Sequence, residues 1–131
     1  MKSDPVVHFE MPYKNPQRVM DFYSKAFGWQ MNQLGSDMDN YVLAGTTEVD
    51  GDMMIKTPGN INGGFYKPDD TNPAIPSVVV SVENLKDSIQ KVMDAGGKTL
   101  GEPVEISGIG QYISFIDTEG NRVGMLQPPK R

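Results

Sequence analysis

The sequence predicts an α+β protein in which one pattern, a strand followed by a helix and three more strands, occurs twice. Two segments, residues 16–27 and 84–95, carry apolar residues at helical spacing, and glycines stand where each would end. Residues 67–76 contain three prolines and two aspartates, which is typical of a linker. These observations predict a single domain over residues 1–131, built from modules at about 5–67 and 76–128.

The first module is expected to begin with an extended segment at residues 6–11, which Pro12 ends. Asn15 can cap a helix, and Pro16 suits its first position, whereas Gly28 suits the C-terminal stop. One face of this helix gathers the apolar residues Val19, Phe22, Tyr23, Ala26 and Phe27. Strands are then predicted at 29–34, 41–44 and 61–66, with a turn at 35–39.

Residues 47–60, between the last two strands of the first module, are predicted to form a long loop. Its flanks are polar and its centre, Met53-Met54-Ile55, is apolar. Long loops in compact domains are often lids or partner contacts. The alternative is a hairpin extension that tucks the three apolar residues into the core.

The second module is expected to repeat this order, with a strand at 77–82 and a helix capped by Asn84. The apolar face of that helix comprises Leu85, Ile89, Val92 and Met93. The remaining strands are predicted at 98–106, 112–116 and 123–126, the last two joined by a tight turn at 117–121.

Alignment of the two modules pairs several positions. When the helix caps are superposed, His8 lies opposite Ser77 and Glu10 lies opposite Val79. When the last strands are superposed, Gly63-Gly64-Phe65 lies opposite Val123-Gly124-Met125. Few letters are shared, so the repeat is one of pattern.

Composition excludes several functions. The net charge of −5, with no cluster of Lys and Arg, disfavours nucleic acid as a partner. There are no cysteines, which excludes a disulfide framework, a zinc–thiolate site and a thiol nucleophile. No apolar run suits a membrane span or a signal peptide, so a cytoplasmic location is expected. His8 is the one histidine, and any imidazole chemistry depends on it.

Several segments, in their order and spacing, resemble one known family. They are Val7-His8-Phe9-Glu10-Met11-Pro12, Phe22-Tyr23, Phe27-Gly28-Trp29, Ile61-Asn-Gly-Gly64, Ala95-Gly-Gly97, Gly108-Ile-Gly110 and the turn Asp117-Thr-Glu-Gly-Asn121 followed by Arg-Val-Gly124-Met. The chain is similar to the vicinal oxygen chelate superfamily, which includes glyoxalase I, bleomycin-resistance proteins and extradiol dioxygenases. The resemblance implies two βαβββ modules whose curved mixed sheets enclose a cleft, usually in a homodimer.

The resemblance also implies where a metal would bind. The family's ligand positions correspond to His8, about Gly64, Ser77 and Gly124, and of these only His8 is a good ligand. Glu10 lies on the same strand face as His8, where it can be a second ligand or a hydrogen-bond partner of the imidazole. We therefore expect no metal and no cofactor.

Two functional hypotheses follow. The first is a protein that binds a small, partly apolar molecule in the cleft without a complete metal site. The residues expected to contact this molecule are His8, Tyr41, Tyr66, Ser77, Tyr112 and Met125. The alternative is an enzyme, such as a lyase, isomerase or dioxygenase, that uses His8 and Glu10 as metal ligands or as acid and base. In both cases a homodimer is expected, with Met53-Met54-Ile55 as one possible contact.

Overall fold

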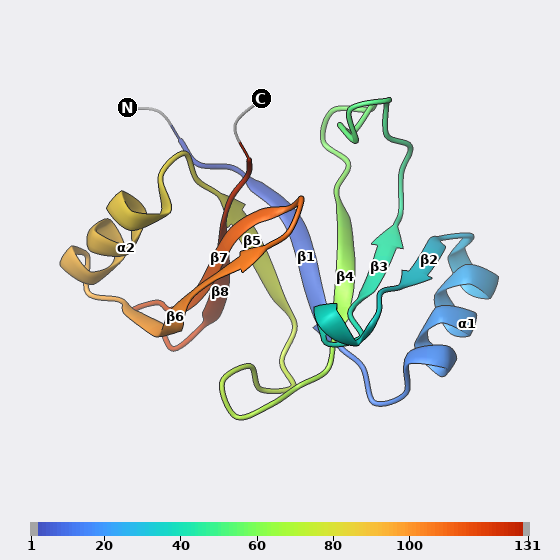
Figure 1. Cartoon of the computed structure of the whole chain (residues 1–131), viewed down its shortest axis with the longest axis horizontal. Helices are drawn as coiled ribbons and strands as arrows, with labels where there is room; N and C mark the ends of the chain where they lie inside the picture. The colour runs from blue at the N-terminus through green and yellow to red at the C-terminus, as the bar shows by residue number, and fades with distance from the viewer. Residues whose placement is uncertain (1–2, 130–131) are drawn as a thin grey trace. The chain divides into compact units, whose positions relative to one another are not determined.

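The computed structural model describes residues 3–129, which divide into two compact units (Figure 1). One unit is His8–Pro76, and the other combines the residues from Ser77 onward with the N-terminal residues 3–7. Within the described residues, neither helix is long and apolar enough to cross a bilayer.

The first module follows the predicted order. Its elements are β1 (Val6–Pro12), α1 (Pro16–Phe27), β2 (Gln30–Gln33), a short 3-10 helix η1 (Ser36–Met38), β3 (Val42–Gly45) and β4 (Asn62–Tyr66). The strands lie in the order β2-β3-β4-β1, with β1 parallel to β4 and the other pairs antiparallel. Because α1 and the strands β2 and β3 come between them in the chain, β1 and β4 can lie side by side in the same direction.

The second module repeats this topology. Its elements are β5 (Ser77–Ser81), α2 (Leu85–Asp94), β6 (Lys98–Ile106), β7 (Gly110–Ile116) and β8 (Arg122–Gln127), in the strand order β6-β7-β8-β5. Here β5 is parallel to β8. The α+β class and the two βαβββ modules predicted from the sequence are thus confirmed.

Local capping explains where both helices begin. The Asn15 side-chain oxygen accepts from the backbone N–H of Arg18, and Asn84 accepts from that of Asp87, each at 3.0 Å. The first helix ends at Gly28, whose φ of 72° is the left-handed conformation that glycine adopts without strain.

Each helix covers one face of its own module and buries a separate core. The first core comprises Tyr13, Val42, Ala44 and Phe65, packed against Phe9, Met11, Val19, Met20, Tyr23, Trp29 and Met31. The second comprises Val82, Leu85, Ile113 and Met125, packed against Val80, Ile89, Val92 and Phe115. The first core contains five aromatic residues, whereas the second is largely aliphatic and contains only one, Phe115.

The predicted helix faces are only partly buried. Phe22 and Phe27 belong to the predicted apolar face of α1, but they are 57% and 64% exposed, and Met93 of α2 is 45% exposed. The sheet covers only part of the apolar face of α1, because that face is wider than the contact between helix and sheet. Phe22 and Phe27 instead pack edge-on against each other, with ring centroids 6.5 Å apart.

The loop between β3 and β4 projects beyond the ends of those strands (Figure 1). Val49 and Ile55 form an isolated antiparallel bridge, and the Asp50 carboxylate accepts from the backbone N–H of Met54 at 3.0 Å. Met53 and Met54 at its tip are 75% and 53% exposed. The hairpin alternative is therefore right about the shape, but wrong in tucking these two methionines into the core.

Candidate functional site

The sheet of the first module presents a polar face on the side away from α1. Side chains alternate along a strand, and Phe9 and Met11 of β1 pack into the core beneath the helix. His8 and Glu10 therefore point to the opposite face. The register pairs Glu10 with Gly64 of β4, and Gly64 shares that face.

A tyrosine joins the two polar side chains of β1. The Tyr41 hydroxyl donates to Glu10 Oε2 at 3.0 Å, and His8 Nε2 lies 3.0 Å from the same hydroxyl oxygen. Glu10 is buried, with 8% of its surface exposed, whereas His8 and Tyr41 are half-buried. The three residues form a continuous hydrogen-bonded chain, which fixes their relative positions.

Gly64 makes room for this tyrosine. A Cβ at Gly64 would overlap the hydroxyl and ring atoms of Tyr41. Tyr41 stands directly before β3, and its ring crosses the backbone of β4 to reach Glu10. The glycine is thus required by the close approach of the ring.

Burial lowers the pKa of His8 below its usual value of 6.5, and the Glu10 carboxylate partly opposes this. The desolvation effect is the larger, so the folded protein favours the neutral imidazole. A neutral imidazole has one N–H donor and one nitrogen acceptor, which sets what His8 can offer to a ligand.

The second module repeats the tyrosine and the glycine but not the ionisable pair. A Cβ at Gly124 would lie 2.6 Å from the Tyr112 hydroxyl. Gly124 pairs with Val79, just as Gly64 pairs with Glu10, and this agrees with the predicted alignment of the two halves. Val79 is 2% exposed. The Ser77 hydroxyl is buried and has no hydrogen-bond partner among residues 3–129.

Two other predicted site residues have structural contacts. The Tyr66 hydroxyl bonds to the carbonyls of Pro73 and Ile75, the latter at 2.9 Å, and so ties the linker to β4. Met125 is 2% exposed and packs in the second core beneath α2. Both side chains are thus engaged in the packing of their own module.

The donor set does not fit a tightly held metal. No three His, Cys, Asp or Glu side chains gather at one point within residues 3–129. The family's remaining positions offer Gly64, Gly124 and the hydroxyl of Ser77. His8 Nε2 and Glu10 Oε2 are already joined through Tyr41, and stable divalent sites need three or four protein donors.

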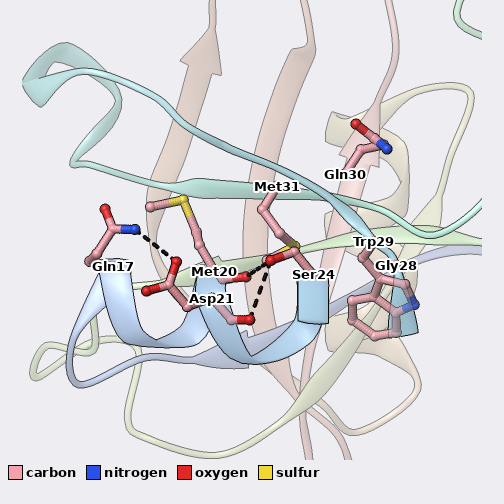
Figure 2. A pocket seen from close by; sticks show the side chains of 8 residues that line it. All are labelled: Gln17, Met20, Asp21, Ser24, Gly28, Trp29, Gln30 and Met31. Carbon is pink, nitrogen blue, oxygen red and sulfur yellow. Dashed lines mark hydrogen bonds between the residues drawn. The ribbon is translucent and has the colours of Figure 1, made fainter. Parts of the chain in front are cut away.

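Two shallow hollows lie elsewhere on the first module. One hollow is lined by residues between the start of α1 and β2, and its volume is about 520 Å³ (Figure 2). Its polar groups on the helix are committed there: Gln17 donates to Asp21 at 3.0 Å, and Ser24 donates to the Met20 carbonyl at 2.8 Å. The other hollow lies beside Tyr13 and Lys67. Neither contains His8, Glu10 or Tyr41.

Sequence reasoning grouped Tyr41 with His8 but missed its bond to Glu10 and its packing on Gly64. A signal was present in the repeat. Tyr41 directly precedes Val42, which pairs with the core residue Phe65 of β4. Tyr112 directly precedes Ile113, which pairs with the core residue Met125 of β8. Sequence reasoning also gave no role to Arg122, a buried residue with 6% exposure.

The chain belongs to the Glyoxalase/Bleomycin resistance protein/Dioxygenase superfamily, whose family model matches residues 6–125. It is 27% identical over 124 residues to a glyoxylase-like domain-containing protein of Didymella fabae, covering 92% of this chain and 91% of that one.

Solved structures show the same fold at lower identity. A hypothetical protein from Bacillus halodurans superposes with a TM-score of 0.69 at 13% identity, covering 99% of this chain and 98% of that one. Methylmalonyl-CoA epimerase from Mycobacterium tuberculosis gives 0.66 at 13% identity, with 99% and 93% covered. The Streptomyces coelicolor epimerase in complex with 2-nitronate-propionyl-CoA gives 0.70 at 11% identity, with 98% and 100% covered.

Proposed function

We propose that this protein binds a small, partly apolar molecule on the polar face of the first module, without a metal. The observation that carries the proposal is the Tyr41 hydroxyl, which lies within 3.0 Å of both His8 Nε2 and Glu10 Oε2. His8 and Glu10, the two best metal donors of the chain, are therefore both hydrogen-bonded to the same tyrosine hydroxyl.

The surroundings of this chain of hydrogen bonds suit a ligand with an apolar body. Leu43 pairs with Gly64 across β3 and β4, and Gly64 adds no side chain to the surface. Binding sites of this kind are mostly apolar, with a few placed polar groups that orient the ligand. The homodimer and the cytoplasmic location expected from the sequence remain predictions.

The first test is elemental analysis of the purified protein. We expect less than stoichiometric zinc, nickel, iron and manganese, and no change in melting temperature when EDTA is added, because no metal is bound to the native state. About one metal per chain that is lost in His8→Ala would instead favour the alternative, a metal-dependent enzyme using His8 and Glu10.

The second test is binding of a small aromatic probe, indole, followed by chemical-shift changes. We expect His8→Ala to weaken binding and to leave the fold intact. Gln17→Ala, in the hollow over α1, is the matched control and should leave binding unchanged. Loss of binding in the control but not in His8→Ala would place the ligand in that hollow.

A further inference from the structure

We propose that His8 is held in the tautomer that carries its proton on Nε2, and that its Nδ1 accepts a hydrogen bond from the ligand. The ligand class that fits is a neutral N–H or O–H donor on an apolar body. This inference rests on the proposed function and names the chemistry that the same site would recognise.

The tautomer follows from counting protons along the chain of hydrogen bonds. A carboxylate can only accept, so the single proton of the Tyr41 hydroxyl is directed to Glu10 Oε2, 3.0 Å away. The hydroxyl oxygen then has only acceptor capacity left for His8. Because Nε2 is 3.0 Å from that oxygen, the imidazole must supply the hydrogen on Nε2.

The other ring nitrogen is accessible for recognition. Within residues 3–129 the imidazole forms its hydrogen bond through Nε2 to Tyr41, and no residue there bonds to Nδ1. Nor does Nδ1 belong to the buried side-chain nitrogens and oxygens of that region that have no partner. In the neutral imidazole this atom is an acceptor.

The surroundings restrict the ligand further. A metal on the Nε2 side would need the lone pair that this tautomer lacks. An anion would be repelled by the nearby Glu10 carboxylate, whereas a neutral donor satisfies Nδ1 without carrying charge into a half-buried site. A ligand without a donor would leave Nδ1 unpaired, which costs affinity.

The tautomer can be read directly in the ligand-free protein, because the chain has a single histidine. Long-range proton–nitrogen correlation spectra at pH 8, with nitrogen-labelled histidine, should show the proton on Nε2 alone. Tyr41→Phe removes the acceptor and should give a mixture of both tautomers. A proton on Nδ1 in the wild type, or an unchanged pattern in Tyr41→Phe, would overturn the assignment.

The ligand class is tested with two probes and two substitutions. Indole has an N–H donor, and N-methylindole has the same apolar body without it. In the wild type we expect indole to bind about 2- to 10-fold more tightly, the range of one hydrogen bond. His8→Gln extends an amide toward the Nε2 position, so it keeps the bond to Tyr41 but should bring the ratio to about 1. His8→Asn reaches only the Nδ1 position, so it should keep the preference.

The opposite result, a preference kept in His8→Gln and lost in His8→Asn, would assign recognition to the Nε2 side and overturn the inference. If neither probe binds the wild type, the proposed function and the ligand class both fail. The tautomer, measured without ligand, is decided separately from either outcome.

Discussion

The two modules share a strand order and a tyrosine packed on a glycine, yet they differ at the two positions that carry chemistry. In the first, the strand beside the glycine bears His8 and Glu10, whereas in the second the aligned residues are Ser77 and Val79. The tyrosine–glycine contact is thus a property of the repeat. The pair His8 and Glu10, joined through Tyr41, has no ionisable counterpart at the aligned positions of the second module.

The cores differ in the same way. Phe65 packs against the rings of Phe9 and Tyr23, with centroids 6.3 and 5.1 Å away, whereas its counterpart Met125 packs against aliphatic side chains and Phe115. One backbone plan therefore accommodates two kinds of packing, because each core needs only residues of the right volume beneath its helix.

The largest difference between the modules is expected from truncating these cores. Phe65→Ala should lower the free energy of unfolding by about 3–5 kcal/mol, because it leaves a cavity among aromatic rings. Met125→Ala should cost less, about 2–3 kcal/mol, since flexible neighbours collapse more easily. Urea denaturation of both variants measures this. A larger loss from Met125→Ala would show that the second core is the more tightly packed.

A smaller effect is expected where the modules are alike. Gly64→Ala should cost about 1–3 kcal/mol, as overpacking usually does, because the new methyl group displaces the Tyr41 ring. Gly124→Ala should cost less, since its Cβ would lie 2.6 Å from Tyr112 and overlap it less deeply. Melting temperatures give the order.

The control is the double variant Tyr41→Ala with Gly64→Ala. Removing the ring should abolish the penalty of the added methyl group, so that the two substitutions are strongly non-additive. Additive losses of stability would mean that the new methyl group clashes with the backbone rather than with the Tyr41 ring.

The smallest expected effect is a dependence of stability on pH. It arises in the first module, which contains the one histidine of the chain. The pKa of His8 is lowered in the folded state, so below its unfolded value of 6.5 the unfolded chain binds the proton more readily. The stabilisation by neutral His8 is complete above pH 6.5 and is lost as the pH falls through the lowered folded pKa. Urea midpoints between pH 8 and 5 should decline in the wild type and decline less in His8→Gln.

Equal slopes in the two proteins would mean that His8 titrates alike in both states. The Glu10 carboxylate makes the effect small, because its attraction for the imidazolium offsets part of the desolvation that lowers the pKa. The same experiment on Ser77→Ala, in the second module, serves as a control that should not change the slope.

Local sequence was sufficient for the elements. Asn15 and Asn84 began the helices because an N-cap needs only its own side chain and the backbone three residues on. The equivalence of Gly64 and Gly124 also followed from pattern, since both fall at the same place in the closing strand. Which apolar residues of α1 are buried did not follow, because the helix pattern does not state how wide the sheet beneath it is.

The site itself was decided by tertiary structure. His8 and Glu10 were placed on one face by the two-residue period of a strand, which is visible in the sequence. Their link through Tyr41 spans more than thirty positions of the chain. It depends on β4 lying in register between β1 and β3 and on Gly64 leaving room for the ring, and no local pattern encodes that approach.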